Sequence, residues 1–168
     1  SSDVCSSDLS TASYFAALAA ATGGEVTIAN LSLETGQPDI RFLHALERMG
    51  ARVRSGSNGV TVSGPSKLSG GFDIDFKPMS DTALTLAALA PFADKPIRIT
   101  GIAHIRRHES DRVAAMAAEL RRAGVPAQEY DDGWLIEPAS PKPVRHETYD
   151  DHRMAMALAV MAARGEGA

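Results

Sequence analysis

The 168-residue sequence has little of several features that would narrow its function quickly. It contains a single cysteine and 5% aromatic residues, and it has no excess of positive charge, because 17 Lys and Arg stand against 21 Asp and Glu. One cysteine cannot form an internal disulfide or a cysteine-based metal cluster, so the composition favours a reducing compartment. A net charge of −4 leaves no basic stripe for a phosphate backbone, which argues against a nucleic acid as partner.

Long apolar runs are also missing from the sequence. No segment approaches the ~20 consecutive apolar residues that cross a bilayer, and no basic and then apolar leader opens the chain. We therefore expect a cytoplasmic protein with no membrane partner. With 44% hydrophobic residues, the chain is long enough to bury a core, which argues against general disorder.

Both ends of the sequence lack the patterns of a complete fold. The opening stretch SSDVCSSDL repeats Ser-Ser-Asp and has neither helical nor strand periodicity, so residues 1–9 are expected to be non-native. The last apolar run ends at ARGEGA, just where a strand should follow. We therefore expect a fragment, in which residues 10–168 form part of a larger domain.

Between these ends the chain repeats itself. ALERMGARV returns in outline as ELRRAGVPA, and the turn SNGVTV returns as DDGWLI, so Gly59 and Gly133 occupy equivalent positions. The apolar periodicity of the second copy predicts a strand, a helix, a strand, a helix and a hairpin. The fold class is therefore α/β, built of repeated β-α-β-α-β-β units. The first unit covers about 10–64 and lacks the opening strand. The second covers 72–138, and the third, 143–168, is truncated.

The limits of individual elements follow from capping residues and apolar periodicity. In the second unit we expect helices over 80–93, capped by Ser80 or Asp81, and over 110–124, capped by its first residue. The third unit is expected to start near Val144 and to break off after its first helix.

Three alanine-rich helices begin at equivalent points of the units, in STASYFAALAAA, SDTALTLAALA and DDHRMAMALAV. Helix N-termini expose unpaired N–H groups and the positive end of the dipole, so three of them aimed at one place would suit a multiply charged anion. Acidic residues there also fit ordinary capping, and this alternative stays open. Arg112 and Arg153 fit capping less well, because a cation in the first turn opposes the dipole unless an anion or a salt bridge compensates it.

The stretches SDTALTLAALAPFA, RRHESDRVAAMAAELRRAG and TYDDHRMAMALAV, with STASYF and LERMGARV upstream, resemble the C-terminal domain of the 5-enolpyruvylshikimate-3-phosphate (EPSP) synthase family. The likeness runs from about Ser10 to the last residues. It implies the inside-out α/β barrel of enolpyruvyl transferases, in which the chain is a fragment of one of two domains that close over the substrates.

The resemblance also implies an activity. The family transfers the enolpyruvyl group of phosphoenolpyruvate to the 5-hydroxyl of shikimate 3-phosphate and releases phosphate, on the shikimate pathway to chorismate and the aromatic amino acids. It uses neither a metal nor an organic cofactor. The expected partners are therefore these two small molecules, and the complete enzyme is expected to be a monomer.

The same resemblance assigns catalytic and donor-binding roles to individual residues. Asp81 matches the aspartate that binds the target hydroxyl and accepts its proton, and Glu109 matches the glutamate usually given the role of proton donor. His152 matches a position beside the reacting carbons. Arg112 and Arg153 match the two arginines that hold phosphoenolpyruvate.

Two positions near the expected shikimate 3-phosphate site depart from the common family pattern. His108 stands where many members have a lysine, and His104 stands where a substrate-contacting asparagine is common. A histidine at position 108 can still donate a hydrogen bond to the substrate, but its charge near neutral pH is conditional.

Other conspicuous residues are expected to be structural. Trp134 and Tyr130 flank a hairpin turn and should pack on the sheet, while Met154 and Met156 should enter the core. His146 has no partner at a suggestive spacing and is given no role. No set of His, Cys and carboxylate residues has the sequence spacing of a metal site.

Two alternatives to this function remain open from the sequence. The related UDP-N-acetylglucosamine enolpyruvyl transferases share the fold and the donor, although the stretch Asp-His-Arg-Met-Ala-Met argues against them. A repeat domain that only binds anions or partners would have no turnover. In the enzymatic case the chain alone is expected to be inactive, because the active site of the family lies between two domains.

Overall fold

The computed structural model describes residues 9–34, 36 and 40–165. The expected non-native segment therefore lies almost wholly outside the described residues, although Leu9 already belongs to the first helix. In chain order the helices, 3-10 helices (η) and strands are α1 (Leu9–Thr22), β1 (Glu25–Ala29), α2 (Arg41–Arg48), β2 (Arg52–Gly56), β3 (Gly59–Ser63), β4 (Phe72–Asp75), η2 (Lys77–Thr82), α3 (Ala83–Leu89), η3 (Ala90–Phe92), β5 (Ile97–Thr100), η4 (Ala103–Arg107), α4 (Arg112–Arg122), β6 (Ala127–Tyr130), β7 (Gly133–Ile136) and α5 (His152–Gly165).

The strands form two sheets, one in each of the first two units. The first has the order β1-β3-β2 and is antiparallel. The second has the order β4-β5-β7-β6, in which β4 and β5 are parallel and the other neighbours antiparallel. From β4 to β7 the chain follows the predicted β-α-β-α-β-β order, and the first unit follows it without the opening strand. The α/β fold class is confirmed.

The two turn glycines that revealed the repeat are held at equivalent places. Gly59 begins β3 and Gly133 begins β7, each directly after its hairpin turn. A Cβ atom would lie 2.1 Å from the carbonyl oxygen of Ile28 at Gly59, and 1.8 Å from that of Ile99 at Gly133. The neighbouring strands β1 and β5 come so close that only glycine fits at these two points.

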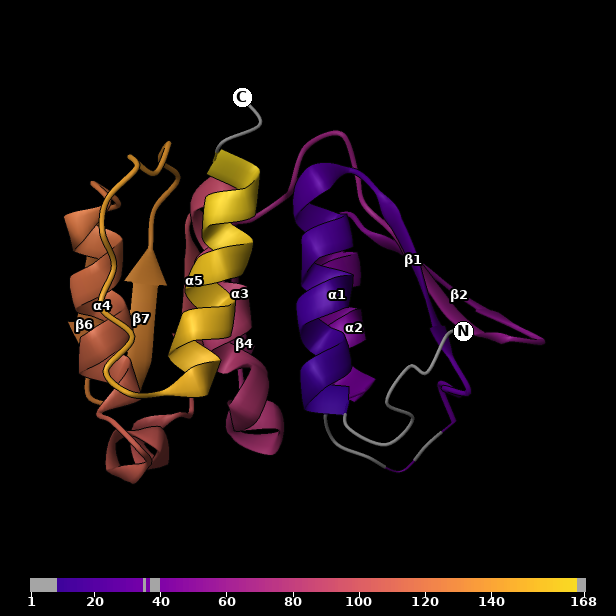
Figure 1. Ribbon diagram of the computed structural model, residues 1–168, viewed down its shortest axis with the longest axis horizontal. Helices are drawn as coiled ribbons and strands as arrows, with labels where there is room; N and C mark the ends of the chain where they lie inside the picture. The colour runs from indigo at the N-terminus through magenta and orange to yellow at the C-terminus, as the bar shows by residue number, and fades with distance from the viewer. Residues whose placement is uncertain (1–8, 35, 37–39, 166–168) are drawn as a thin grey trace.

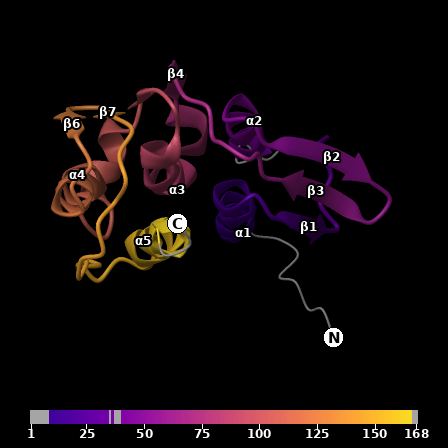
Figure 2. The same ribbon diagram turned by 90° about the horizontal axis from the view of Figure 1, so that it is seen from above.

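Helices α1, α3 and α5 lie side by side in the middle of the molecule and begin at the same end, the lower end in Figure 1 (Figures 1 and 2). Every residue of α3 is buried. These helices are rich in small buried side chains, among them Ala16, Ala17, Ala87 and Ala88, and small side chains let helices approach closely. The prediction that these helices begin in register is therefore confirmed.

The start of α3 was predicted wrongly. The α-helix begins at Ala83 rather than at Ser80, because the residues before it belong to the 3-10 helix η2, which runs to Thr82 and is kinked at Met79. Its N-cap residue is Thr82, and neither Ser80 nor Asp81 caps it. The carboxylate of Asp81 therefore stands in front of the helix rather than folding back onto its first N–H groups.

The N-cap of α4 was also predicted one residue too early. Asp111, not Ser110, precedes the helix, and its carboxylate accepts a hydrogen bond from the backbone N–H of Ala114 at 3.0 Å. Aspartate is as good an N-cap as serine, so capping preference alone does not distinguish Ser110 from Asp111. The hydroxyl of Ser110 is directed instead to the candidate site.

The third unit, which was expected to start near Val144, lacks the strand that opens a complete β-α-β-α-β-β unit. Between β7 and α5 the described chain forms no strand, and 137–151 run as an extended connector along α4 to the lower end of α5 (Figure 1). Three backbone bonds hold the first part of this connector, because the N–H groups of Glu137, Ala139 and Lys142 donate to the carbonyls of Pro126, Pro91 and Ala123 at 3.0, 2.9 and 2.8 Å. A strand needs a neighbour for its ladder of hydrogen bonds, and no strand of the described chain pairs with this segment.

Most residues expected to be structural lie in the core. Trp134 is fully buried, and its indole N–H donates to the carbonyl of Val113 at 2.8 Å. Met154 is buried as predicted, but the prediction for Met156 was wrong, because it lies on the outer face of α5 and is 41% exposed.

Within the described ranges, no helix has the length and apolar character needed to cross a membrane.

Candidate active site

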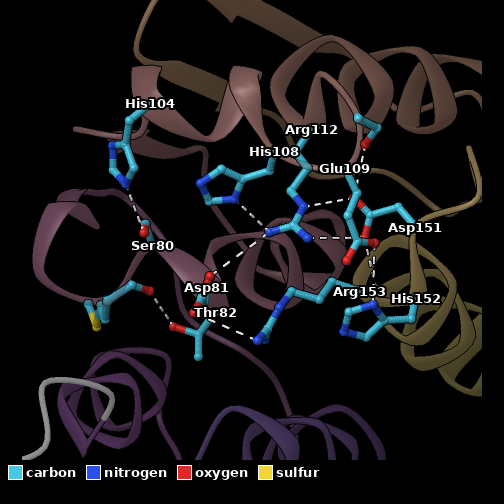
Figure 3. Close-up of polar contacts among 12 residues, drawn as sticks. Ser80, Asp81, Thr82, His104, His108, Glu109, Arg112, Asp151, His152 and Arg153 are labelled. Carbon is cyan, nitrogen blue, oxygen red and sulfur yellow. Dashed lines mark hydrogen bonds and ion pairs between the residues drawn. The ribbon is translucent and has the colours of Figure 1, made fainter.

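Ionisable side chains from separate units meet where α3, α4 and α5 begin (Figure 3). Asp81 comes from η2, in front of α3. The turn before α4 and its first residue supply Glu109 and Arg112, and the turn before α5 and its first residues supply Asp151, His152 and Arg153. The repeat brings these segments together because each unit starts its alanine-rich helix at the same end.

A buried ion pair joins the starts of α4 and α5. Arg112 is 4% exposed and Asp151 1% exposed. Arg112 Nε donates to Asp151 Oδ2 at 2.8 Å, and Arg112 Nη2 donates to Oδ1 at 3.3 Å. The Ser110 hydroxyl donates to Oδ2 at 2.9 Å, and the N–H of Arg153 donates to Oδ1 at 3.0 Å, so Asp151 also caps α5.

The charge of Asp151 is stabilised by these contacts. Burial alone would raise the pKa of this carboxyl, but the hydrogen bonds from Arg112 and Ser110, together with the charge of Arg112, outweigh burial and hold the pKa below its ordinary value. The pair is therefore ionised at neutral pH and locks the two helix starts together.

Asp81 lies between the two arginines without pairing closely with either. Its Oδ1 is 3.9 Å from Arg112 Nη1, and its Oδ2 is 3.7 Å from Arg153 Nη2. The side chain of Asp81 is 45% exposed. Because both separations exceed a good hydrogen-bond length, the carboxylate can still accept a hydrogen bond from the hydroxyl group of a ligand, or its proton.

The first unit contributes to the same place through Tyr14 of α1. Burial raises the pKa of the Tyr14 hydroxyl, and the charge of Arg153 and a hydrogen bond with that residue oppose the increase only in part. The hydroxyl is therefore protonated at neutral pH and supports the guanidinium of Arg153 from the side of α1.

Glu109 and His152 face each other at the exposed edge of the cluster. Glu109 Oε2 is 3.4 Å from His152 Nδ1. Ligand atoms of Glu109, Asp151 and His152 lie within 4.8 Å of one another, a grouping that sequence spacing did not reveal. Asp151 already accepts hydrogen bonds from Arg112 and Ser110, so the Arg112 guanidinium neutralises the carboxylate that a metal ion would need. We therefore assign Glu109, Asp151 and His152 to the ion-pair network around Arg112.

His108 contacts the buried arginine in a way that determines its tautomer. Arg112 Nη1 lies 3.0 Å from His108 Nδ1, and because a guanidinium can only donate, Nδ1 must accept. In this arrangement the ring proton is on Nε2. His104 lies further out, where its Nε2 hydrogen-bonds with the Ser80 hydroxyl at 2.9 Å, and its ring centroid is 6.1 Å from that of His108.

The structure thus gathers Asp81, Glu109, Arg112, His152 and Arg153 around one point, with His108 attached through Arg112. His104 lies beside this group rather than within it. The interpretation of the sequence missed Tyr14, Ser80, Ser110 and Asp151. Asp151 had one available signal, because a carboxylate immediately before a helix with a cation in its first turn is placed to neutralise charge there. No local pattern indicated Tyr14.

The arrangement is suited to an anionic ligand and to proton transfer. Two guanidinium groups can bind carboxylate or phosphate oxygens. Carboxylates and a histidine stand within reach of the same volume, and these are the side chains that most often act as general acids and bases.

Comparison with known proteins gives the family. The model of the EPSP synthase (3-phosphoshikimate 1-carboxyvinyltransferase) family matches residues 2–168. This chain belongs to the EPSP synthase family. Its relatives include 3-phosphoshikimate 1-carboxyvinyltransferase 2 of Halalkalibacterium halodurans, which is 49% identical over 162 residues covering 95% of this chain and 36% of the relative. A Nostoc punctiforme 3-phosphoshikimate 1-carboxyvinyltransferase is 47% identical over 160 residues, covering 95% and 37%.

Solved structures agree with this family at the level of the fold. EPSP synthase from Acinetobacter baumannii superposes with a TM-score of 0.79 at 24% identity, over 94% of this chain and 40% of that one. The enolpyruvyl transferase NikO from Streptomyces tendae has a TM-score of 0.57 at 22% identity, over 94% and 36%. The chain therefore spans about a third of the length of the family members that it matches in sequence.

Proposed function

We propose that this chain is the part of a 3-phosphoshikimate 1-carboxyvinyltransferase that binds phosphoenolpyruvate and the reacting hydroxyl of shikimate 3-phosphate. The complete enzyme transfers the enolpyruvyl group to that hydroxyl and releases phosphate. The observation that carries the proposal is the convergence of two arginines, two carboxylates and a histidine from the second and third units. The relative that is 49% identical supports it, because its name states this activity.

In this proposal, Arg112 and Arg153 hold the carboxylate and phosphate groups of phosphoenolpyruvate. Asp81 lies 3.9 Å from the first guanidinium and 3.7 Å from the second, so a donor bound by both arginines lies next to that carboxylate. Asp81 accepts the proton of the shikimate 5-hydroxyl while its oxygen bonds to C2 of phosphoenolpyruvate.

Glu109 completes the addition by giving a proton to the methylene carbon of phosphoenolpyruvate. His152, 3.4 Å from Glu109, orients this carboxyl group beside the reacting carbons. In the elimination step the Glu109 carboxylate takes a proton back from the same carbon while the C2–O bond to phosphate breaks, which forms the enol ether and releases phosphate. Each step needs only proton transfer and charge stabilisation.

The histidines that replace common family residues bind shikimate 3-phosphate in this proposal. The N–H on Nε2 of His108 is available as a hydrogen-bond donor while its Nδ1 accepts from Arg112. His104 extends the same edge of the site toward Ser80. An imidazole N–H at position 108 takes the place of the ammonium group that a lysine supplies.

A hybrid enzyme tests the proposed function. The matched segment of the Halalkalibacterium halodurans relative, 36% of its length, is replaced by the corresponding residues of this chain. We expect phosphate release from phosphoenolpyruvate with shikimate 3-phosphate, and none with UDP-N-acetylglucosamine. We also expect the hybrid to be a monomer that works in the presence of EDTA, and the 168-residue chain alone to be inactive.

The same hybrid decides between the enzymatic and non-catalytic alternatives. A folded hybrid that binds shikimate 3-phosphate but releases no phosphate would mean that this chain only binds anions. Turnover with UDP-N-acetylglucosamine would assign the chain to the related transferase. An Asp81→Asn hybrid serves as the matched control, because it should retain the fold and lose turnover.

A further inference from the structure

A carboxylate that the proposed chemistry does not use is completely buried in α4. Glu119 is 0% exposed, although glutamate is among the residues least often buried without a partner. It lies seven residues after Arg112 on the same helix, about 10 Å along the helix axis. A charge in such a position needs hydrogen bonds that compensate the loss of water.

The compensating groups come mainly from the connector that leads to α5. His146 Nδ1 donates to Glu119 Oε2 at 2.7 Å, and the N–H of Glu147 donates to the same oxygen at 3.3 Å. The Tyr149 hydroxyl donates to Oε1 at 3.0 Å. From α4 itself, Arg122 Nη2 lies 3.4 Å from Oε1. We call Glu119, His146, Tyr149 and the N–H of Glu147 the Glu119 clamp.

The clamp ends where the backbone is strained. Tyr149 and Asp150 have φ angles of 58° and 52°, in the left-handed region that an aspartate tolerates but a bulky tyrosine rarely adopts. Burial, the hydrogen bond to Glu119 and the charge of Glu119 raise the pKa of Tyr149, so its hydroxyl keeps the proton that it donates. The contact with Glu119 therefore helps to hold Tyr149 in a conformation that it would not adopt by itself.

The strained pair leads directly into the candidate active site. Asp151 follows Asp150, its N–H donates to the carbonyl of Thr148 at 3.0 Å, and α5 starts at the next residue with His152 and Arg153. The turn is thus attached to α4 at two points. One is the Asp151–Arg112 ion pair at the start of the helix, and the other is the Glu119 clamp about two turns further along it.

We propose that Glu119 is a positioning residue for enolpyruvyl transfer, which acts by fixing the turn 148–151 and thereby the directions of His152 and Arg153. The claim that Glu119 aids turnover rests on the proposed function. The claim that Glu119 fixes the turn 148–151 does not depend on it. Small displacements of a binding group lower the rate strongly, so a side chain that never touches the substrate can still control turnover.

Amide exchange in the 168-residue chain tests the fixing of the turn without any catalysis. Tyr149→Phe removes the hydroxyl and keeps the ring. We expect the amide protons of Arg153 and Ala155, both bonded to Asp151, to exchange roughly tenfold faster. Tyr130→Phe is the matched control, because Tyr130 lies on β6 under the guanidinium of Arg98, and should leave these amides unchanged. Equal exchange in wild type and Tyr149→Phe would overturn the proposal.

Kinetics in the hybrid enzyme distinguish positioning from a merely structural role. We expect Tyr149→Phe to lower kcat/KM for phosphoenolpyruvate about tenfold, and Glu119→Gln at least as much, while the affinity for shikimate 3-phosphate stays within about twofold. In an Arg153→Lys background, Tyr149→Phe should cost clearly less than tenfold, because part of what it positions is already lost.

Other outcomes contradict the proposal at separate points. Fully additive effects of Tyr149→Phe and Arg153→Lys, or a lower unfolding midpoint with unchanged kinetics, would mean that the clamp only stabilises the fold. A hybrid without turnover would contradict the proposed function, and the exchange measurement would still decide whether Glu119 fixes the turn.

Discussion

Replacing Asp151 with asparagine should destabilise the chain far more than its small change in shape suggests. Asparagine caps a helix as well as aspartate does, so the start of α5 is preserved. The charge opposite Arg112 is lost, and this guanidinium, 4% exposed, then has Asp81 at 3.9 Å as its remaining carboxylate. Removing one partner of a buried ion pair costs about 3–5 kcal/mol. Because Asp81 compensates in part, we expect a loss of about 3 kcal/mol in the free energy of unfolding.

Urea unfolding of the chain, followed by tryptophan fluorescence, measures this loss. Trp134 is the single tryptophan of the sequence and is fully buried, so its emission reports the loss of the core. Asp150→Asn is the matched control, because Asp150 is exposed and its left-handed backbone suits asparagine equally well. The control should change stability by less than about 0.5 kcal/mol.

The pH dependence gives a second check on the same ion pair. The pKa of Asp151 is lower in the folded chain than its ordinary value of 3.8. Its contribution is therefore complete above that value and is lost as the pH falls through the lower, folded pKa. The stability gap between wild type and Asp151→Asn should shrink below pH 3.8. A loss under about 1 kcal/mol at pH 7, or a gap that stays constant in acid, would refute the reasoning.

Two other substitutions test the chemistry and the fold. Glu109→Gln in the hybrid should lower turnover ~10²-fold or more, since a general acid contributes about that much. Calorimetry should find the binding of shikimate 3-phosphate nearly intact. Near-normal turnover would remove Glu109 from the chemistry. Gly133→Ala should cost about 2 kcal/mol or more in urea unfolding, because overpacking costs of this order follow when a methyl group is forced into occupied space. Gly56→Ala, whose new Cβ would make an ordinary 3.8 Å contact, should cost less, and equal effects would contradict the close approach of β5 to Gly133.

The parts of the fold that followed from the sequence are those encoded locally. The hairpins around Gly59 and Gly133 and the alanine-rich helices appear as predicted, because turn glycines and apolar periodicity act over a few residues. The start of α3 and the missing strand near Val144 depend on other segments. A 3-10 turn after β4 displaced the helix start, and a segment without a neighbouring strand cannot form a ladder.

The candidate site shows the same division. Asp81, Glu109, Arg112, His152 and Arg153 were identified through short motifs, each of which lies within one segment of the chain. The groups that hold them in place were missed, because each partner comes from a distant part of the sequence. Asp151 meets Arg112 across 39 residues, and Tyr149 meets Glu119 across 30. Burial made these charges important, and burial is not visible in a local pattern.

A crystal structure of the Glu109→Gln hybrid with phosphoenolpyruvate and shikimate 3-phosphate tests the central claim most directly, because slow turnover should preserve both substrates. We expect oxygens of phosphoenolpyruvate within hydrogen-bond distance of the guanidinium groups of Arg112 and Arg153. We also expect the 5-hydroxyl of shikimate 3-phosphate to lie against the carboxylate of Asp81. Substrates bound elsewhere, with these three side chains facing solvent, would contradict the assignment of this cluster as the site of enolpyruvyl transfer.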